Sequence, residues 1–467
     1  MYKIKFGTDG WRAIIAKDYT IDNLKRISYA TARWMVAKKM SKVVIGYDCR
    51  FGGKMFAECA ASVFAHSNID VILSDGFVST PMVSLGVVKY SADMGIVITA
   101  SHNPPSYNGF KLKSSFGGPT IPTHLNEIES IIQDDPLGSL PTIETLVEQD
   151  KVVYEDLEQM YVDHIEDNFD LDLIRSKVTL AYDAMYGAGQ NVIRRLFPSA
   201  KLIHCDFNPG FHGRSPEPIL RNLPEIATFL KRSSKYALGL ANDGDADRIG
   251  LFDEDGAFVD SHHILLLLLK YLYEHKGMAG KVVTAFSVTN KMDTLAKHYG
   301  LEMKRTKIGF KYIAEIMINE DVLVGGEESG GLAVKGHIPE RDGIWTGLII
   351  MEFIAKTGKS LKELVKEIHE LVGPFYYSRD DLHLTESKKQ AIISYCKNGN
   401  LTSIGPYEII GSDDLDGFKY YIPDDGWLMI RPSGTEPVLR VYAQASSEAG
   451  VKDLLKNAHE VLSQIES

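Results

Sequence analysis

A serine and a histidine stand at the end of a short apolar run, where they could carry out group-transfer chemistry. The run, residues 95–100 (GIVITA), is rich in β-branched residues and predicts a buried strand. Ser101 and His102 follow it, and the prolines at 104–105 prevent both strand pairing and an immediate helix. A hydroxyl beside an imidazole, with Lys111 a few residues on, suits a nucleophile and its proton acceptor. An ordinary polar turn is the alternative for the same residues.

A second segment, residues 242–248 (NDGDADR), holds three carboxylates that alternate with small residues after a strand-like run. The three residues are Asp243, Asp245 and Asp247. Carboxylates at this spacing can converge on one hard cation. An EF-hand calcium loop needs glycine at its sixth position, where this chain has Arg248, although Glu254 does stand at the twelfth. So few protein oxygens leave positions open for a phosphate, which favours Mg²⁺ over Ca²⁺; a solvated acidic turn is the alternative.

Two glycine-containing loops further along the chain are suited to a phosphosugar. In residues 325–331 (GGEESGG), glycines allow close approach of the backbone, while Glu327 and Ser329 offer hydrogen-bonding groups to neighbouring hydroxyls. In residues 431–437 (RPSGTEP), Arg431 can grip two phosphate oxygens beside two hydroxyls and a glycine turn. Each loop taken alone is equally typical of a turn that binds nothing.

The elements that must position these segments alternate between strands and helices. The sequence predicts a strand at 42–48, a helix at 55–66 and a strand at 70–73, which is typical of a mainly parallel sheet. After residue 373 the regular alternation of strand and helix ends, and the sequence predicts helices mixed with antiparallel strands. The predicted fold class is therefore α/β, with three similar mixed α/β domains followed by a smaller α+β domain. The predicted domains are 1–150 with the serine motif, 151–255 with the aspartates, 256–372 with the glycine-rich loop and 373–467 with the phosphate cradle.

Composition narrows the class of protein further. The chain has 467 residues, of which 44% are hydrophobic and 24% charged, as in ordinary globular proteins. Its net charge of −11 argues against nucleic acid or an anionic membrane as a partner. The four cysteines are scattered without a metal-binding spacing, which fits a reducing cytoplasm. No apolar run is long enough to span a bilayer, so we expect a cytoplasmic protein, either monomer or dimer.

The four motifs together resemble those of the α-D-phosphohexomutases, the superfamily of phosphoglucomutases and phosphomannomutases. The resemblance covers essentially the whole chain, with the motifs in the same order. It implies four domains around a central active-site cleft, and a serine, Ser101, that is phosphorylated in the resting enzyme. The motifs stand at residues 99–104, 243–248, 326–331 and 431–437.

The resemblance also implies roles for individual residues and for two cofactors. Mg²⁺ and a hexose 1,6-bisphosphate, which serves as activator and intermediate, would accompany a phosphosugar substrate. The implied metal ligands are Asp243, Asp245, Asp247 and the phosphorylated Ser101. The sugar hydroxyls would be held by Glu327 and Ser329. The non-reacting phosphate would be held by Arg431, Ser433, Gly434 and Thr435. The site would also be lined by Arg12, His102, Lys111, Arg248 and Lys307.

The sub-type within the superfamily rests on a few positions. Glucosamine-phosphate mutases typically carry glutamine in the sugar loop and glycine between the last two aspartates. Bifunctional mannose/glucose enzymes typically carry methionine and end that loop in histidine. This chain has Glu328, Gly331 and Ala246 at those places. The residues Glu-Glu-Ser at 327–329, followed by His-Ile-Pro-Glu-Arg-Asp-Gly at 337–343, look more like a phosphoglucomutase. We expect His337, in the charge-rich loop 336–343, to take the role of the missing loop histidine.

These observations predict interconversion of α-glucose 1-phosphate and glucose 6-phosphate. Phosphoserine 101 would donate its phosphoryl group, and a 1,6-bisphosphate would turn in the cleft and return the other phosphate. His102 and Lys111 are both candidates for the general base. Phosphomannomutase or phosphoglucosamine mutase activity by the same mechanism is the alternative. A non-catalytic sugar-phosphate sensor is expected less, because neither Ser101 nor an aspartate is missing. A sugar phosphatase, which would release phosphate to water, is the other less expected alternative.

Overall fold

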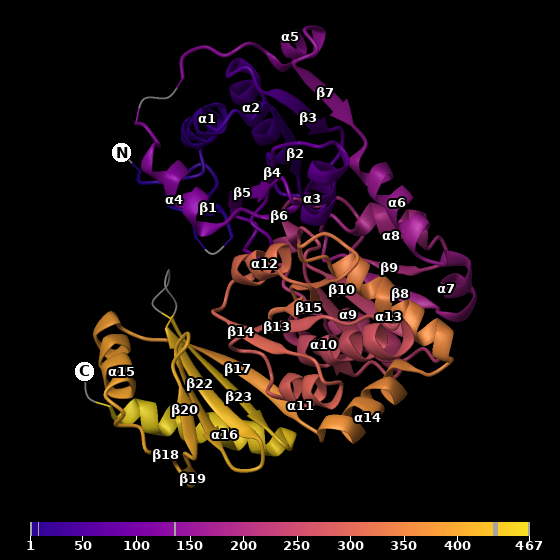
Figure 1. Cartoon of the computed structure of the whole chain (residues 1–467), viewed down its shortest axis with the longest axis vertical. Coiled ribbons are helices and arrows are strands. Elements are labelled where there is room, and N and C mark those ends of the chain that lie inside the picture. The colour runs from indigo at the N-terminus through magenta and orange to yellow at the C-terminus, as the bar shows by residue number, and fades with distance from the viewer. Residues whose placement is uncertain (1, 8, 135–136, 433–437, 466–467) are drawn as a thin grey trace. The chain divides into compact units, whose positions relative to one another are not determined.

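The computed structural model describes residues 2–7, 9–134, 137–432 and 438–465. The chain forms two compact units, one from Met1–Val283 with Gly309–Leu364 and one from Thr284–Ile308 with Val365–Ser467. The chain passes between the units inside strand β13 (Lys281–Ala285), after Ile308, and inside helix α14 (Leu361–Val372). Figure 1 labels the helices and strands along the chain.

The first sheet of unit one contains the strand that leads to Ser101. Its order is β1-β5-β4-β2-β3-β7, with β6 beside β5. The central strands β4, β2 and β3 and the edge strand β7 run parallel, whereas β5 and β1 are antiparallel to their neighbours. The strands are β1 (Trp11–Ile14), β2 (Lys42–Tyr47), β3 (Asp70–Ser74), β4 (Met94–Ile98), β5 (Tyr107–Ser114), β6 (Gly118–Pro119) and β7 (Val152–Glu155). The helices are α1 (Ile21–Ala37), α2 (Gly53–His66), α3 (Thr80–Lys89), α4 (Pro122–Ser130) and α5 (Ile143–Glu148).

Alternation along β2 and β4 divides the core of this sheet between its two faces. Ile45 and Ile96 pack in one apolar cluster with α1 and α2, which lie side by side (Figure 1). On the other face Gly46 leaves room for α3, since a Cβ there would lie 2.5 Å from Val83. Because α3 follows β3, its N-terminus lies at the carboxyl edge of the sheet, where Ser101 follows β4.

The second sheet positions the aspartate segment, and its order is β12-β11-β10-β8-β9. Strand β10 is parallel to β8 and forms a hairpin with β11 that pairs Asn242 with Ile249. The aspartates therefore occupy the turn of this hairpin. The strands are β8 (Leu180–Asp183), β9 (Lys201–Ile203), β10 (Leu238–Asn242), β11 (Ile249–Phe252) and β12 (Phe258–Val259). The helices are α6 (Leu157–Asn168), α7 (Leu171–Lys177), α8 (Gln190–Leu196), η1 (Phe211–Gly213), η2 (Leu220–Asn222) and α9 (Pro224–Lys231).

The third sheet, in the order β14-β13-β15-β16, positions the glycine-rich loop. Strands β15 and β16 form a hairpin that pairs Gly326 with Leu332, so Glu327 and Ser329 stand in its turn. The remaining strands are β14 (Met303–Thr306), β15 (Val322–Gly326) and β16 (Leu332–Val334). The helices are α10 (Ser261–Lys270), its continuation η3 (Tyr271–His275), α11 (Lys291–His298), α12 (Phe310–Asn319) and α13 (Gly343–Thr357).

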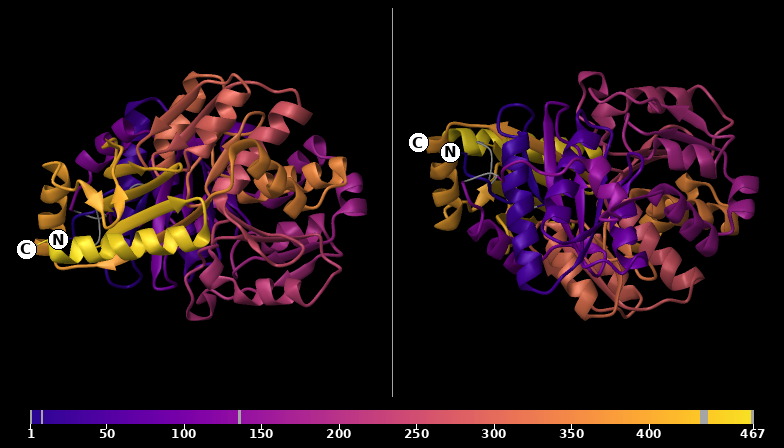
Figure 2. Two further views of the ribbon diagram at one scale, coloured as in Figure 1. Left: turned by 90° about the horizontal axis from the view of Figure 1, so that it is seen from below. Right: turned by 90° about the horizontal axis from the view of Figure 1, so that it is seen from above.

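The C-terminal sheet belongs to unit two and is antiparallel, in the order β17-β23-β22-β21-β20. One face, with Leu428, is covered by α15 and α16, and the yellow helix α16 lies along it in Figure 2. The other face carries Trp427, which packs with Phe286 from the segment after β13. The strands of this sheet are β17 (Tyr376–His383), β20 (Gly411–Asp413), β21 (Phe418–Ile422), β22 (Gly426–Pro432) and β23 (Val438–Ala445). The strands β18 (Ser403–Ile404) and β19 (Tyr407–Glu408) pair with each other in a separate sheet. The helices are α15 (Glu386–Lys397) and α16 (Glu448–Gln464).

A buried lysine joins the two parts of unit two. The Lys419 ammonium donates hydrogen bonds to the main-chain oxygens of Phe286 and Val288, at 3.1 and 3.4 Å. It also lies 3.9 Å from the ring centroid of Trp427. Burial lowers the pKa of this amine well below its usual range. The segment after β13 is therefore part of the core that supports the C-terminal sheet.

The structure confirms the predicted fold class of α/β sheets followed by an α+β C-terminal part. Strand β2 and helix α2 lie within two residues of their predicted bounds. The three boundaries drawn from the sequence between the four domains stay predictions. All four cysteines are free. Among the described residues, no helix combines the length and apolar character that crossing a bilayer requires.

Candidate active site

Ser101 occupies a buried turn immediately beyond β4. Its φ of 51° lies in the left-handed region, which a side chain disfavours. Its N–H donates to Thr99 Oγ1 at 2.8 Å, and its Oγ donates to Asp243 Oδ2 at 2.8 Å. His102 Nδ1 lies 3.3 Å from the same Oγ. The predicted nucleophile thus contacts both the imidazole and the first aspartate.

One arginine holds the whole turn that carries Ser101. The buried Arg50 guanidinium donates to the main-chain oxygens of Ser101, Asn103, Pro104 and Tyr107, at 2.5, 2.7, 2.9 and 3.0 Å. Four carbonyls of one turn therefore point at one cation. This contact fixes the backbone on which the Ser101 hydroxyl is displayed.

Arg50 is itself held by a buried carboxylate. Asp48 Oδ2 lies 3.3 Å from Arg50 Nε and accepts a hydrogen bond from Thr99 Oγ1 at 2.5 Å. Burial raises the pKa of Asp48 to about 6, against the opposing effects of Arg50 and Thr99. The Arg50 guanidinium also lies 4.9 Å from the ring centroid of Phe211.

The three aspartates of the β10–β11 turn converge, and each is fully buried. One oxygen from each lies within 4.8 Å of the others. Asp243 Oδ1 accepts from the main-chain N–H of Arg248 at 3.0 Å. Within the part of the chain that the structure describes, Asp245 Oδ1 and Asp247 Oδ1 are buried and have no hydrogen-bond partner.

Two cations neutralise part of this acidic cluster. Lys111 Nζ lies 2.7, 3.2 and 2.8 Å from oxygens of Asp245, Asp247 and Asp9. Arg341 Nη2 lies 2.8 Å from Asp247 and 2.5 Å from Asp9. Asp9, in the loop before β1, therefore bridges the two cations.

Neighbouring charges and burial shift the pKa values of the aspartates, Lys111 and His102 in different directions. Burial together with the other two aspartates raises the pKa of Asp243 well above its usual range. Burial acts in the same direction on Asp245, but Lys111 outweighs it and holds the pKa of that carboxyl low. The Lys111 pKa is raised by the carboxylates despite its burial. Burial, with Arg248 and Arg12 nearby, lowers the pKa of His102 well below its usual range.

The aspartate cluster fits a divalent metal ion. Two buried carboxylate oxygens without hydrogen-bond partners are costly unless a cation completes their coordination. Hard oxygen donors of this kind suit Mg²⁺, which keeps further positions for phosphate oxygens. Asp243, Asp245 and Asp247 are the residues that would hold the ion.

The glycine-rich loop lies next to the aspartate hairpin within unit one. Arg248 and Gly331 form a β-bridge, and Ile249 N donates to Gly330 O at 3.1 Å. Glu327 is buried, and its Oε1 accepts from Gly309 N at 2.7 Å. Burial raises the pKa of Glu327 to about 7, opposed by the charge of Arg341.

His337 packs at the start of α13. Its Nε2 lies 2.9 Å from Asp342 Oδ2, and its ring stacks on Trp345 with centroids 3.9 Å apart. Asp342 also caps α13 by accepting from the N–H groups of Ile344 and Trp345. The role of His337 as a substitute for a loop histidine stays a prediction.

The remaining predicted residues divide between the units. Arg12, in unit one, donates to Asn103 Oδ1 at 2.7 Å, beside the serine turn. In unit two, Asp416 links Arg431, whose Nε lies 3.3 Å from Asp416 Oδ1, to the main-chain N–H of Ile308. Lys307, next to Ile308, is exposed. The predicted phosphate-binding residues that lie outside the described part are Ser433, Gly434 and Thr435.

Several residues in contact with the predicted site were missed by sequence reasoning. Arg50 and Asp9 stand in loops of the first domain, and Arg341 stands within the charge-rich loop. Thr80, at the start of α3, donates to Asp245. A signal did exist for Arg341, because it is a single cation between two acids in a loop already conspicuous for charge.

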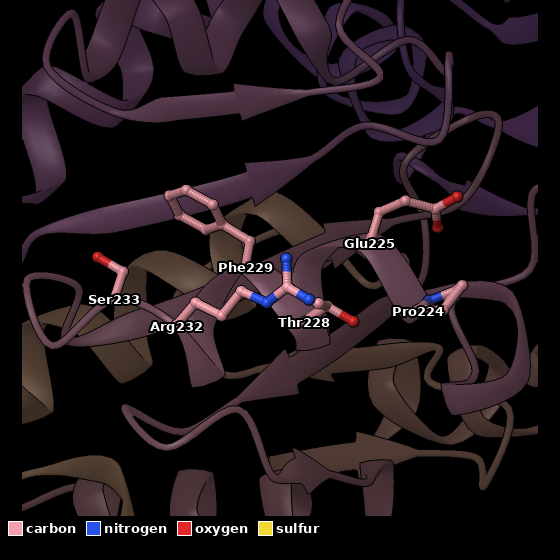
Figure 3. Close-up of a pocket in the computed structure, with 6 residues that line it drawn as sticks. All are labelled: Pro224, Glu225, Thr228, Phe229, Arg232 and Ser233. Carbon is pink, nitrogen blue, oxygen red and sulfur yellow. The ribbon is translucent and has the colours of Figure 1, made fainter.

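A surface depression of about 530 Å³ lies elsewhere, along α9 (Figure 3). All six of its lining residues come from α9 and the two residues that follow it. Glu225 among them pairs with Arg214 at 2.7 Å. This depression has neither the nucleophile nor the converging carboxylates of the Ser101 site.

The sequence matches a known family over most of its length. Residues 3–137, 159–256 and 260–371 match phosphoglucomutase/phosphomannomutase α/β/α domains I, II and III. Residues 415–460 match the C-terminal domain of the same family. The chain belongs to the phosphoglucomutase/phosphomannomutase family. It is therefore a phosphohexomutase, an intramolecular phosphotransferase that acts on phosphosugars.

Relatives of this phosphohexomutase span its whole length. A phosphoglucomutase/phosphomannomutase of Thermococcus kodakarensis is 31% identical over 97% of this chain and 96% of its own. A phosphoglucosamine mutase of Methanococcus vannielii is 33% identical over 97% of each chain. A crystal structure from Thermus thermophilus, of a protein assigned as a phosphomannomutase, has a TM-score of 0.88 and 32% identity, and covers 99% of each chain. The family depends on Mg²⁺, and the buried aspartates fit that ion.

Proposed function

We propose that this phosphohexomutase moves a phosphoryl group between the 1- and 6-hydroxyls of a hexose through phosphorylated Ser101. The observation that supports this most directly is the Ser101 hydroxyl, 2.8 Å from Asp243 within a buried cluster of carboxylates and cations. Phosphoryl transfer depends mainly on positioning and charge neutralisation, and this cluster offers both.

Each half of the reaction exchanges one oxygen–phosphorus bond for another. The bond to Ser101 Oγ breaks, a bond to the free sugar hydroxyl forms, and the hydroxyl proton passes to a base. The resulting hexose 1,6-bisphosphate turns round, and its other phosphoryl group returns to Ser101, which leaves the isomer. The reaction needs no net water, and this separates it from phosphatase chemistry.

We assign the base to His102 rather than to Lys111, from their contacts. His102 Nδ1 lies 3.3 Å from Ser101 Oγ, the atom that carries the phosphoryl group in this proposal. Lys111 Nζ contacts three carboxylates, which keep it protonated. Lys111 then contributes positive charge, together with Arg12 and Arg248.

Mg²⁺ would be held by Asp243, Asp245 and Asp247 and would stabilise the negative charge that develops on the transferred group. A phosphoryl group on Ser101 would place like charges beside Asp243, which is why a cation is needed there. The phosphorylated Ser101 then becomes a further ligand.

The sugar and its second phosphate would be held by the two loops. Glu327 and Ser329 stand in the β15–β16 turn and offer hydrogen bonds to neighbouring sugar hydroxyls. Arg431, aligned by Asp416, would grip the non-reacting phosphate. Lys307 would assist it, since it precedes Ile308, whose N–H donates to the same carboxylate. Ser433, Gly434 and Thr435 would complete that phosphate site, and His337 is placed in the loop before α13.

We propose mannose and glucosamine phosphates as substrates at least as good as glucose phosphates. The residues Glu327-Glu328-Ser329 alone favour a glucose enzyme, but relatives named phosphoglucosamine mutase are 30–33% identical over nearly the whole chain. A loop that reads two neighbouring hydroxyls cannot discriminate between hexoses that differ at another carbon. The relatives therefore outweigh the three loop residues.

The test is a comparison of initial rates with four sugar 1-phosphates, those of glucose, mannose, glucosamine and N-acetylglucosamine. Each assay contains Mg²⁺ and a trace of the matching 1,6-bisphosphate, and free phosphate is followed in parallel. We expect conversion to 6-phosphates without stoichiometric release of phosphate. Release of phosphate at the rate of substrate loss would identify a phosphatase, and binding without turnover would identify a sensor. Turnover of glucose 1-phosphate alone would overturn the broader sugar assignment.

A further inference from the structure

Helix α3 begins beside the aspartate cluster, and its first residue contacts one aspartate twice. The Thr80 main-chain N–H donates to the main-chain oxygen of Asp245 at 3.0 Å. The Thr80 hydroxyl donates to Asp245 Oδ2. Both residues are fully buried. Thr80 belongs to helix α3, which packs on the first sheet, and Asp245 to the β10–β11 turn of the second sheet, so this double contact fixes the aspartate from outside its own hairpin.

The contacts distinguish the two oxygens of the Asp245 carboxylate. Oδ2 receives Thr80 Oγ1 and Lys111 Nζ, the latter at 2.7 Å. Oδ1 is buried and has no hydrogen-bond partner among the described residues. Two donors from different elements, α3 and β5, thus fix the plane of the carboxylate and leave one oxygen for another ligand.

Lys111 could not hold this orientation of the Asp245 carboxylate alone, because its ammonium group also contacts two other carboxylates. Its Nζ also contacts Asp247 and Asp9, at 3.2 and 2.8 Å. Without the Thr80 hydroxyl, the Asp245 carboxylate could rotate and offer both oxygens to the ammonium. The oxygen that is now unpartnered would then be neutralised by lysine instead of by a metal ion.

We propose that Thr80 is a positioning residue for the metal site, and this inference rests on the proposed assignment of Asp245 as a Mg²⁺ ligand. By occupying Oδ2 and the main-chain oxygen of Asp245, Thr80 reserves Oδ1 for the ion. Residues that orient a ligand in this way typically change metal affinity by about 10- to 100-fold when they are removed.

A purely structural role makes a different prediction. If Thr80 only joins α3 to the aspartate hairpin, its loss lowers stability without changing metal affinity in the protein that remains folded. Thr31 supplies the matched control, since it is also fully buried and donates its hydroxyl to Ile27 O at 2.8 Å, within α1. Thr31→Val removes a buried hydroxyl of the same kind from a place that the site does not use.

The experiment measures Mg²⁺ affinity by calorimetry on the full chain, dephosphorylated and free of sugar. The proteins are wild type, Thr80→Val, Thr80→Ser and Thr31→Val, and their melting temperatures are recorded without metal. Should Thr80→Val not fold, Thr80→Ala replaces it, because the smaller side chain cannot clash. Rates are then measured as a function of Mg²⁺ concentration.

We expect Thr80→Val to bind Mg²⁺ about 10- to 100-fold more weakly, with Thr80→Ser and Thr31→Val within about threefold of wild type. The rate of Thr80→Val should recover substantially at high Mg²⁺. Wild-type affinity in Thr80→Val, or an equal defect in Thr80→Ser, would overturn the inference while leaving the metal site intact. Failure of the wild type itself to bind Mg²⁺ would overturn the proposed metal site and the inference with it.

Discussion

Replacing Arg50 by lysine should impair phosphoryl transfer far more than substrate binding. The guanidinium donates to four carbonyls of the turn at 101–107, two through each terminal nitrogen. An ammonium retains the charge opposite Asp48 but lacks the planar fork, so it can satisfy only part of this set. Ser101 sits in a left-handed conformation that costs a non-glycine residue about 1–2 kcal/mol, and these contacts offset that cost.

The size of the effect follows from the bonds that are lost. A hydrogen bond to a charged group contributes about 1.5–3 kcal/mol, and lysine should lose the equivalent of one or two. A loss of about 2–4 kcal/mol in the preference for the active turn corresponds to roughly 30- to 1000-fold in rate. Binding of the sugar phosphate should change much less, because Arg50 faces the backbone of the turn rather than the aspartate cluster.

The assay is single-turnover transfer from a hexose 1,6-bisphosphate to Ser101, followed by intact-protein mass. Arg26→Lys is the matched control, since Arg26 is also buried and donates to main-chain oxygens of Tyr2 and Gln133. Both variants should lose stability, but only Arg50→Lys should lose rate. A milder variant, Phe211→Leu, removes the ring that lies over the Arg50 guanidinium. A folded Arg50→Lys enzyme that transfers phosphate within threefold of the wild-type rate would refute this reasoning.

Four further predictions concern the site. Ser101→Ala should abolish both phosphorylation by the bisphosphate and mutase activity. Ser106 is an exposed serine of the same turn, and Ser106→Ala should change neither. A gain in protein mass from a phosphoryl group in Ser101→Ala would contradict the assignment. Asp245→Asn, or removal of Mg²⁺ by a chelator, should lower the rate roughly a thousandfold or more, and full activity after chelation would exclude the metal. Burial raises the pKa of Glu327 from 4.5 to about 7, so between these pH values the folded protein keeps a proton that the unfolded chain releases. The free energy of unfolding should therefore fall as the pH rises through this interval, by on the order of 3 kcal/mol. Glu327→Gln should therefore melt higher than wild type at pH 8 but not at pH 5, and equal differences at both pH values would argue against the raised pKa. Arg431→Ala should weaken sugar-phosphate use in both reaction directions by about 2–5 kcal/mol, with Arg431→Lys recovering only part, and a defect in one direction alone would show that the phosphate site is not shared.

The strand ends that precede Ser101 and Asp243 could be predicted from the sequence. Functional residues gather beyond the carboxyl ends of strands in such sheets, and Ser101 follows β4 while Asp243 follows β10. These strands belong to different sheets, so the strand pattern did not predict the contact between the two residues, which only the family resemblance implied. The apolar runs and turn residues that define these strands are patterns of a few consecutive residues, and such patterns can be recognised in a single sequence.

The residues that sequence reasoning missed act over long separations. Arg50 closes on a turn more than 50 residues away, and Thr80 on an aspartate 165 residues away. A lone arginine or threonine has no periodicity, so nothing local distinguishes it from a surface residue. The sugar preference was harder still, because the effect of Glu328 and Gly331 on the bound sugar depends on the whole pocket.

The contacts of Lys419 limit which segments of this enzyme could be replaced by those of a relative in a chimaeric protein. A chimaera that took its C-terminal segment from another family member, with a crossover at residue 373, would lose Lys419 and its hydrogen bonds to the carbonyls of Phe286 and Val288. Phe286 would then pack against whatever residue the transplanted sheet carries in place of Trp427. Recombination would be expected to succeed only when the segment 284–308 travels with the C-terminal sheet. The segment 284–308 and the C-terminal sheet, although separated in the sequence, would therefore have to be exchanged together.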